Sequence, residues 1–493
     1  SRRPDPVLQQ VEHFDSPITT VNDSFKSVTK YWDRINRPEQ LLHTLPNVVQ
    51  TLLDPADCGP VFLALPQDVQ VETFDFPEEF FNEVIHQIRR PKADSNSITK
   101  AVAIIKSSKK PLIIAGGGVR YSKAHKELSN FANEFGIPVV ETVAGKSSLL
   151  ASDSAWCGPV GVTGCDPANK LAQEADLIIS VGCRLQDFTT GSWTLFKNPA
   201  YKLISINTAR FDATKRNAVA LIGDAKESLV ELGSLLSGYK ADSAWSSRRA
   251  TTRNEVISNI EVRTKEKLEL PSYAQVVKLI NEIAEPEDYV LTAAGGLPGE
   301  LNNNWLSKSF DSFDCEYGYS CMGYEVAGAW GAALAYESTG RAGKVISMVG
   351  DGSYLMLNSE ILSAVNNGNS IIYILCDNQG FAVIQRLQTS NGSKSFRTMF
   401  NDSDLDKPAN VDFVAHAKSM GANAKKVTLE GLKDEFAAAK NHAGVSVLVI
   451  DTHPSKWTEG GAFWEVGVSG SSNEVAIQSA HARQIEGKAK RRL

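Results

Sequence analysis

The chain has 493 residues, of which 42% are hydrophobic and 22% are charged, and its formal net charge is −6. These ordinary globular values predict two to four domains, and they give no reason to expect nucleic acid or a membrane as a partner. Seven scattered cysteines without a C-x-x-C pair, and the lack of an 18-residue apolar run or a signal peptide, lead us to expect a soluble cytoplasmic protein.

The first 72 residues contain too few strands for a complete domain. A helix is predicted over residues 37–53, and a buried strand over 59–66 that Pro66 closes. One strand and its helices cannot form a sheet. Residues 73–100 are charged and aromatic, with a break at 91–95, and are therefore predicted to be a linker between domains.

Strands and helices alternate between residues 101 and 240. Strands are predicted at 111–115, 137–140, 175–181, 202–206 and 219–222. Helices lie between them, for example at 123–135 and 167–174. This alternation predicts a parallel, doubly wound sheet.

Two turns in this region are similar to nucleotide-binding loops but complete neither pattern. Gly116-Gly117-Gly118 follows a strand, yet Tyr121 stands where the last glycine of G-x-G-x-x-G is needed. Gly145-Lys146-Ser147 has Val140 in place of the first glycine of a Walker loop. Both are interpreted as close-packed turns, and nucleotide binding by this domain stays an open question.

Residues 241–270 are predicted to be a charged helical connector to a last domain at 271–455, which a tail over 456–493 follows. The last domain begins with an amphipathic helix at 272–283 and a strand at 288–293. The turn after this strand is rich in small residues, which allow backbone amides to contact an anion.

A second segment of this domain, at 315–323, contains short Gly and Ser residues followed by Met322. It lies just before a glycine-rich helix at 323–336. Such a loop suits close contact with a planar ligand. Cys321 has no predicted basic partner, so we interpret it as a packing residue and not as a nucleophile.

The central feature of the last domain is a β-α-β unit. A strand at 344–349 ends at Gly350-Asp351-Gly352-Ser353, and a strand at 370–376 ends at Asp377-Asn378-Gln379-Gly380. The helix between them is predicted at 354–367. Its apolar residues are expected to face the sheet: Leu355, Leu357, Ile361, Leu362 and Val365. Ligands bind at the carboxyl ends of strands in open α/β sheets.

The oxygen atoms at these two strand ends suit a hard cation. Asp351 offers a carboxylate, Asn378 an amide oxygen and Gly380 a backbone carbonyl, and Mg²⁺ completes such a set with phosphates and water. Gly352 allows the backbone to approach a phosphate, and the amides that open the next helix favour an anion. The unit therefore predicts a site for Mg²⁺ bound to a diphosphate. The alternative is a pair of unrelated turns, which the matched spacing disfavours.

The rest of the last domain is predicted from simpler patterns. Residues 381–401 are polar, so they are predicted to be a mobile loop beside the site. Helices are predicted at 411–420 and 429–440, and the last strand at 445–450.

Gly350-Asp351-Gly352, followed by Asn378-x-Gly380, resembles the thiamine-diphosphate motif of the acetohydroxyacid synthase and pyruvate decarboxylase superfamily. The similarity is closer to one branch, the hydrolases that open cyclic 1,2-diones in myo-inositol breakdown. The stretches that carry it run along most of the chain, at residues 4–10, 31–35, 105–113, 140–142, 144–147, 316–326 and 463–468.

This resemblance implies an α/β architecture of successive doubly wound parallel-sheet domains. Residues 1–72 would be the carboxyl-terminal part of a pyrimidine-binding domain, 101–240 a central domain and 271–455 the diphosphate-binding domain. The first half of the pyrimidine-binding domain would carry the glutamate that activates the cofactor, and no glutamate here matches it. We therefore expect an incomplete first domain in a chain truncated at its amino end.

The resemblance also implies which residues bind the cofactor. Those implied to contact thiamine diphosphate are Gly295, Gly296, Leu297, Ser320, Met322, Gly350, Gly352 and Ser353. The Ser320 carbonyl would bind the cofactor's amino group, and Met322 would hold the cofactor bent. Those implied to hold Mg²⁺ are Asp351, Asn378 and Gly380.

The implied reaction is the hydrolytic cleavage of a C–C bond in a small cyclic dione, carried out by a homodimer or homotetramer. Two alternatives stay open. One is a carboligase of the acetolactate synthase type that uses the same cofactor, and the other is a non-catalytic fragment that only binds the cofactor.

Overall fold

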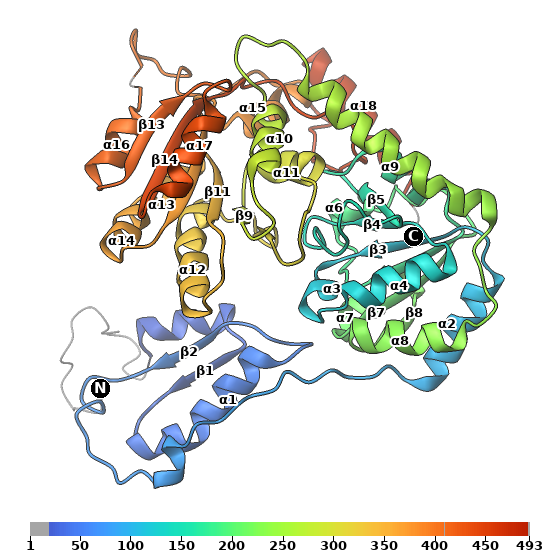
Figure 1. Ribbon diagram of the computed structural model, residues 1–493, viewed down its shortest axis with the longest axis horizontal. Coiled ribbons are helices and arrows are strands. Elements are labelled where there is room, and N and C mark those ends of the chain that lie inside the picture. The colour runs from blue at the N-terminus through green and yellow to red at the C-terminus, as the bar shows by residue number, and fades with distance from the viewer. Residues whose placement is uncertain (1–18, 409, 492–493) are drawn as a thin grey trace.

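The computed structural model describes residues 19–408 and 410–491. The stretch at residues 4–10, which carries part of the resemblance, lies outside this description. Figure 1 shows a small amino-terminal segment and two larger α/β units, each built on its own sheet. The predicted fold class, successive α/β units with parallel sheets, is confirmed.

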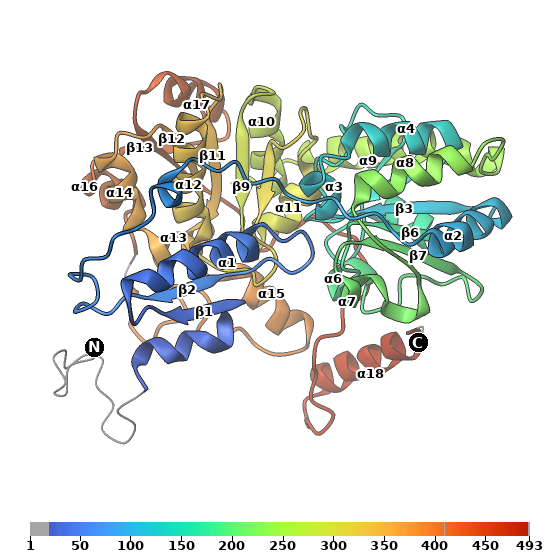
Figure 2. The same cartoon turned by 90° about the horizontal axis from the view of Figure 1, so that it is seen from below.

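The amino-terminal segment contains a parallel sheet that has two strands within the described residues, β1 (Tyr31–Arg34) and β2 (Val61–Ala64). Helix α1 (Leu41–Leu53) connects them, as predicted. The prediction of one strand in this region is wrong, because β1 mixes aromatic and charged residues and is only partly buried. A largely extended segment then runs to the central unit (Figures 1 and 2).

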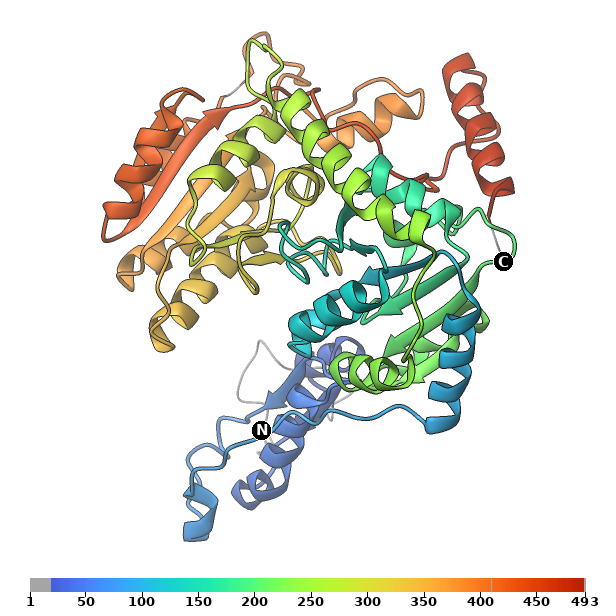
Figure 3. The same ribbon diagram turned by 45° about the vertical axis from the view of Figure 1, so that its right-hand side comes forward.

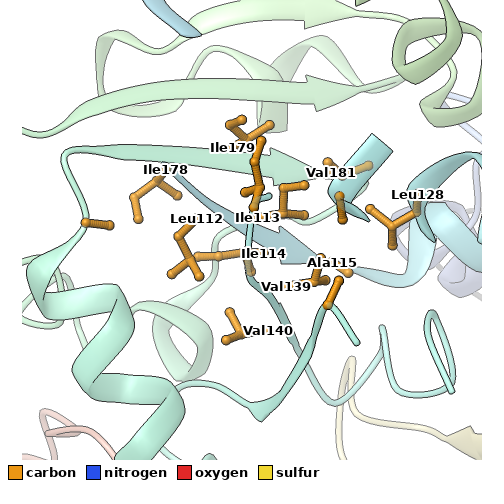
Figure 4. Packing of buried hydrophobic residues seen from close by; sticks show 14 of the residues in the cluster. Leu112, Ile113, Ile114, Ala115, Leu128, Val139, Val140, Ile178, Ile179 and Val181 are labelled. Carbon is orange, nitrogen blue, oxygen red and sulfur yellow. The ribbon is translucent and has the colours of Figure 1, made fainter. Parts of the chain in front are cut away.

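The central unit holds a parallel sheet of six described strands in the order β5-β4-β3-β6-β7-β8. Their bounds are β3 (Pro111–Ala115), β4 (Val139–Glu141), β5 (Trp156–Pro159), β6 (Leu177–Val181), β7 (Lys202–Asn207) and β8 (Val219–Ile222). All the predicted strands are present. Only β5 was missed, and its Gly158 and Pro159 are atypical of a strand. Figure 4 shows the aliphatic side chains of β3, β4 and β6 packed at the centre of this unit.

Helices surround the central sheet. They are α2 (Ser95–Ser107), α3 (Gly117–Tyr121), α4 (His125–Phe135), α5 (Asp166–Glu174), α6 (Asp187–Thr190), α7 (Arg210–Ala213), α8 (Ala225–Leu235) and α9 (Ser243–Thr264). The Asp94 carboxylate caps α2, so the linker ends there and not at residue 100. Helix α9 lies within the predicted connector at 241–270 and runs along the central unit toward the carboxyl-terminal unit (Figure 3).

The carboxyl-terminal unit also holds a parallel sheet, with six strands among the described residues in the order β10-β9-β11-β12-β14-β13. Their bounds are β9 (Tyr289–Thr292), β10 (Phe313–Cys315), β11 (Val345–Gly350), β12 (Ile371–Asp377), β13 (Asn423–Val427) and β14 (Val445–Asp451). The helices are α10 (Tyr273–Ile283), α11 (Leu297–Asn304), α12 (Tyr324–Ser338), α13 (Asp351–Leu357), α14 (Glu360–Asn366), α15 (Ala382–Ser390), α16 (Phe413–Ser419), α17 (Leu432–Asn441) and α18 (Val475–Ala489).

The single helix predicted at 354–367 is two helices, α13 and α14, with Asn358 and Ser359 between them. The predicted apolar face is only partly directed at the sheet. Ile361 is fully buried, but Leu355, Leu357 and Leu362 are 38%, 37% and 47% exposed. The prediction that these three leucines pack on the sheet is wrong.

The segment predicted to be a mobile loop at 381–401 begins with helix α15, so this prediction is also wrong for its first half. The glycine and serine cluster lies only after residue 388, and Ala382–Ser390 contains several good helix formers. No helix in the described part of the chain is long and apolar enough to cross a membrane.

Candidate functional site

A cavity of about 760 Å³ opens at the carboxyl edge of the sheet in the carboxyl-terminal unit. Strand β10 lies beside β9 toward one edge of this sheet, and β12 lies beside β11 toward the other edge. The direction in which the strands follow one another therefore reverses between β9 and β11. Ligands of open α/β sheets bind at such a reversal. Every residue predicted for the site lines this cavity: Gly295, Gly296, Leu297, Ser320, Met322, Gly350, Asp351, Gly352, Ser353, Asn378 and Gly380.

The Asp351 carboxylate connects the ends of β11 and β12. One of its oxygens accepts the Gly352 amide at 2.8 Å, and the other accepts the Gly380 amide at 2.7 Å. The side chain is 1% exposed. Burial, and after it the neighbouring Asp377 carboxylate, raise the pKa of Asp351. A nearby cation would therefore stabilise its ionised form.

Asn378 presents an oxygen that lacks a hydrogen-bond partner. Its Nδ2 donates to the Tyr273 hydroxyl at 2.6 Å, whereas its Oδ1 is buried and accepts no hydrogen bond from the described residues. A buried carbonyl oxygen left without a partner costs roughly 1–3 kcal/mol, so a ligand at this place is favoured. A carboxylate and a free amide oxygen on adjoining strand ends fit a hard divalent cation.

The backbone around the cavity needs glycine at several positions. Gly295 has φ +77°, which other residues rarely adopt. A Cβ on Gly352 would lie 2.6 Å from the Phe381 ring, and one on Gly296 would lie 2.0 Å from the Trp457 ring. These glycines line the cavity, and at positions 352 and 296 the lack of a side chain lets the aromatic rings pack directly on the backbone.

Glu325 connects three segments that line the cavity, and sequence reasoning missed its role. It is fully buried on α12, and burial raises its pKa. Its carboxylate accepts the Ala294 amide at 3.0 Å, the Gly323 amide at 3.1 Å and the Ser353 hydroxyl at 2.7 Å. A lone glutamate on the apolar face of a glycine- and alanine-rich helix was the signal that could have found it.

The carboxyl-terminal tail forms one wall of the cavity. Glu300 on α11 is buried, and its carboxylate accepts both the amide and the hydroxyl of Thr458, at 2.7 and 2.6 Å. The aromatic side chains beyond this point that line the cavity are Phe463 and Trp464. Helices α15 and α18, which lie outside the sheets in Figure 2, supply Arg386 and Arg483.

The two glycine-rich turns of the central unit are close-packed, as predicted. A Cβ on Gly118 would lie 2.5 Å from the Gly182 Cα, and one on Gly145 would lie 2.1 Å from the Ala115 oxygen. The prediction for Cys321 is wrong, because this residue is exposed and its amide donates to the Glu316 carboxylate.

Comparison with known proteins places this geometry in a family. Residues 98–232 match the family described as thiamine pyrophosphate enzyme, central domain, and residues 294–450 match the C-terminal TPP binding domain of the same enzymes. The chain is 42% identical to the 3D-(3,5/4)-trihydroxycyclohexane-1,2-dione hydrolase of Clostridium perfringens, over 97% of this chain and 79% of that protein.

Proteins of the same name from Clostridium tetani and Geobacillus thermodenitrificans are each 40% identical to it. The similarity covers 100% and 99% of this chain and 81% and 80% of those proteins. The fold, the cavity and these similarities agree, and the chain belongs to the thiamine pyrophosphate enzyme family.

Proposed function

We propose that the protein is a hydrolase that depends on thiamine diphosphate and Mg²⁺ and opens the ring of 3D-trihydroxycyclohexane-1,2-dione to give 5-deoxy-glucuronate. The observation that carries this proposal is the convergence of every predicted cofactor residue on one cavity. The choice of substrate is supported by the similarity, over nearly the whole chain, to proteins named as that hydrolase.

The residues at the two strand ends would hold the metal and the diphosphate. Asp351, the free Oδ1 of Asn378 and the carbonyl of Gly380 would bind Mg²⁺. The backbone of Gly295–Leu297 and Gly350–Ser353 would bind the diphosphate, with Ser320 and Met322 beside the rest of the cofactor. When bound, thiamine diphosphate supplies the carbon centre that adds to a carbonyl and accepts the electron pair of the breaking C–C bond.

The remaining cavity residues would bind the substrate and control access of water. Trp457, Phe463 and Trp464 provide an apolar wall, and Arg386 and Gln484 offer hydrogen-bond donors to hydroxyl or carboxylate groups. Glu300 is the only glutamate among the described residues that line the cavity, and Thr458 occupies both of its oxygens. We therefore assign Glu300 to positioning, and expect the carboxylate that activates the cofactor from the pyrimidine-binding domain of a partner chain.

We further propose that the protein is a homodimer or homotetramer. Helix α12 packs against α13 and α14, and these helices expose large apolar side chains: Leu334, Leu355, Met356, Leu357 and Leu362. Such a cluster on a surface is typical of a contact with another protein. A second copy of the chain would cover it.

The experiment that tests the proposed function compares two substrates in the presence of thiamine diphosphate, with and without Mg²⁺. We expect the cyclic dione to give an open-chain acid only when both cofactors are present, and pyruvate to give no acetolactate. Formation of acetolactate without turnover of the dione would favour the carboligase. Cofactor binding without turnover of either substrate would favour the non-catalytic fragment.

A further inference from the structure

The phenol of Tyr273 lies against both strand ends that carry the proposed metal ligands. The residue is buried and lines the cavity. Its hydroxyl accepts a hydrogen bond from Asn378 Nδ2 at 2.6 Å, although the two residues are 105 positions apart. A Cβ on Gly350 would lie 3.7 Å from the same hydroxyl, so the phenol also lies close to the residue before Asp351.

In the structure this hydrogen bond occupies the donating end of the Asn378 amide and leaves its accepting end available to a ligand. A side-chain amide has one end that accepts hydrogen bonds and one that donates them. Because Nδ2 is occupied by Tyr273, Oδ1 is left buried and without a partner among the described residues. With the amide turned over, the NH₂ group would point at the cation and could not bind it.

Tyr273 is itself held in place from two directions. It is the first residue of α10, where the Ser272 hydroxyl accepts the Gln275 amide and the Gln275 side chain accepts the Ser272 amide. Its ring packs edge-on against Trp457, with ring centres 5.5 Å apart and an angle of 88°. The hydroxyl is therefore a fixed point from which the amide can be oriented.

We propose that Tyr273 is a positioning residue, which turns the Asn378 carbonyl oxygen toward the Mg²⁺ that carries the cofactor's diphosphate. This inference rests on the proposed function, because it needs the metal at that place. Groups that hydrogen-bond a metal ligand from behind change metal affinity about 10- to 100-fold when they are removed.

The test measures Mn²⁺ binding in the presence of thiamine diphosphate, from the electron paramagnetic resonance signal of free Mn²⁺, and needs no turnover. Tyr273→Phe keeps the ring against Trp457 and removes only the hydroxyl. We expect it to weaken Mn²⁺ binding about 10- to 100-fold. A matched control is Tyr336→Phe, which removes another buried hydroxyl, bonded to the Glu287 carbonyl, and should leave Mn²⁺ binding unchanged.

The same change in an Asn378→Asp background separates orientation from packing. A carboxylate presents an oxygen at either position, so Tyr273→Phe should then alter Mn²⁺ binding by no more than about twofold, the scatter of independent changes. Thermal unfolding of all variants shows that they are folded. Binding unaffected by Tyr273→Phe, or an equal loss in both backgrounds, overturns this inference alone. A wild-type protein that binds no Mn²⁺ with thiamine diphosphate overturns the proposed function as well.

Discussion

The Glu325 carboxylate accepts a hydrogen bond from the Ser353 hydroxyl at 2.7 Å, which connects the first turn of α12 to the first turn of α13. The same carboxylate accepts the amides of Ala294 and Gly323. Three separate segments of the cavity therefore share one buried acceptor group. Their relative positions depend on a side chain that does not itself line the cavity.

Replacing Glu325 by Gln is expected to disturb these three segments together. A Gln side chain offers one acceptor oxygen, so its NH₂ group would face donors. We expect the free energy of unfolding to fall by roughly 1–3 kcal/mol and thiamine diphosphate to bind more weakly. Chemical denaturation and calorimetric titration measure the two effects. The control is Glu337→Gln, at the exposed end of the same helix, whose amide oxygen can still accept the hydrogen bond from Asn369 Nδ2, so it should change neither. Unchanged cofactor affinity in Glu325→Gln would contradict this role.

The Asp351 carboxyl group should make the stability of the metal-free protein depend on pH. Its pKa is raised from 3.8 to about 7 by burial and by Asp377, so the folded state holds a proton that the unfolded state releases above about pH 4. Its contribution to stability is thus complete below about pH 4 and is lost as the pH rises to about 7. Asp351→Asn should reduce this loss by on the order of a few kcal/mol.

Denaturation of both proteins at pH 5 and pH 7.5, without metal, measures this difference. Added Mg²⁺ and thiamine diphosphate should restore stability to the wild type at pH 7.5 and not to Asp351→Asn. The idea fails if the two proteins lose the same stability between the two pH values.

The inner strands of both six-stranded sheets were predicted, whereas most edge strands were missed. The strand predicted at 111–115 has the bounds of β3, because a buried parallel strand is an unbroken apolar run. The edge strand β8 was also predicted, because its four residues are all apolar. The missed strands β5, β10 and β13 lie at sheet edges, and β1 belongs to a sheet with only two described strands. Edge strands need no continuous apolar run, so their pattern is weak.

The candidate site shows the same limit. Asp351 and Asn378 are predictable because they lie next to strand ends that the apolar runs identify. Glu325, Glu300 and Tyr273 were missed because each acts through a residue between 28 and 158 positions away along the chain. Only the packed fold brings such pairs together.

The exposed apolar cluster on α12, α13 and α14 should mediate self-association. Leu362→Asp places a charge at a side chain that is 47% exposed, so the chain should still fold, but burial of that charge in an interface would be costly. We expect sedimentation velocity to show a shift toward the monomer. Val262→Asp on α9, at a side chain that is 71% exposed, is the matched control and should leave the assembly intact. An oligomer unaffected by Leu362→Asp would exclude this surface.

Gly352 should not tolerate a methyl group without a loss of cofactor binding. In Gly352→Ala, the new Cβ would lie 2.6 Å from the Phe381 ring, so the ring must move toward the cavity or the start of α13 must shift. Either movement closes the place where the backbone would approach the diphosphate, and we expect affinity for thiamine diphosphate to fall at least about tenfold, equivalent to 1.4 kcal/mol. Gly299→Ala, where the new Cβ would meet Thr163 at an ordinary 3.5 Å, is the control and should bind the cofactor normally.

In the double variant with Phe381→Ala the steric conflict is removed, so folding stability should recover toward the wild type. If cofactor affinity recovers with it, the ring caused the loss; if affinity stays low, the methyl group itself blocks the diphosphate. Wild-type affinity in Gly352→Ala would show that the diphosphate binds elsewhere.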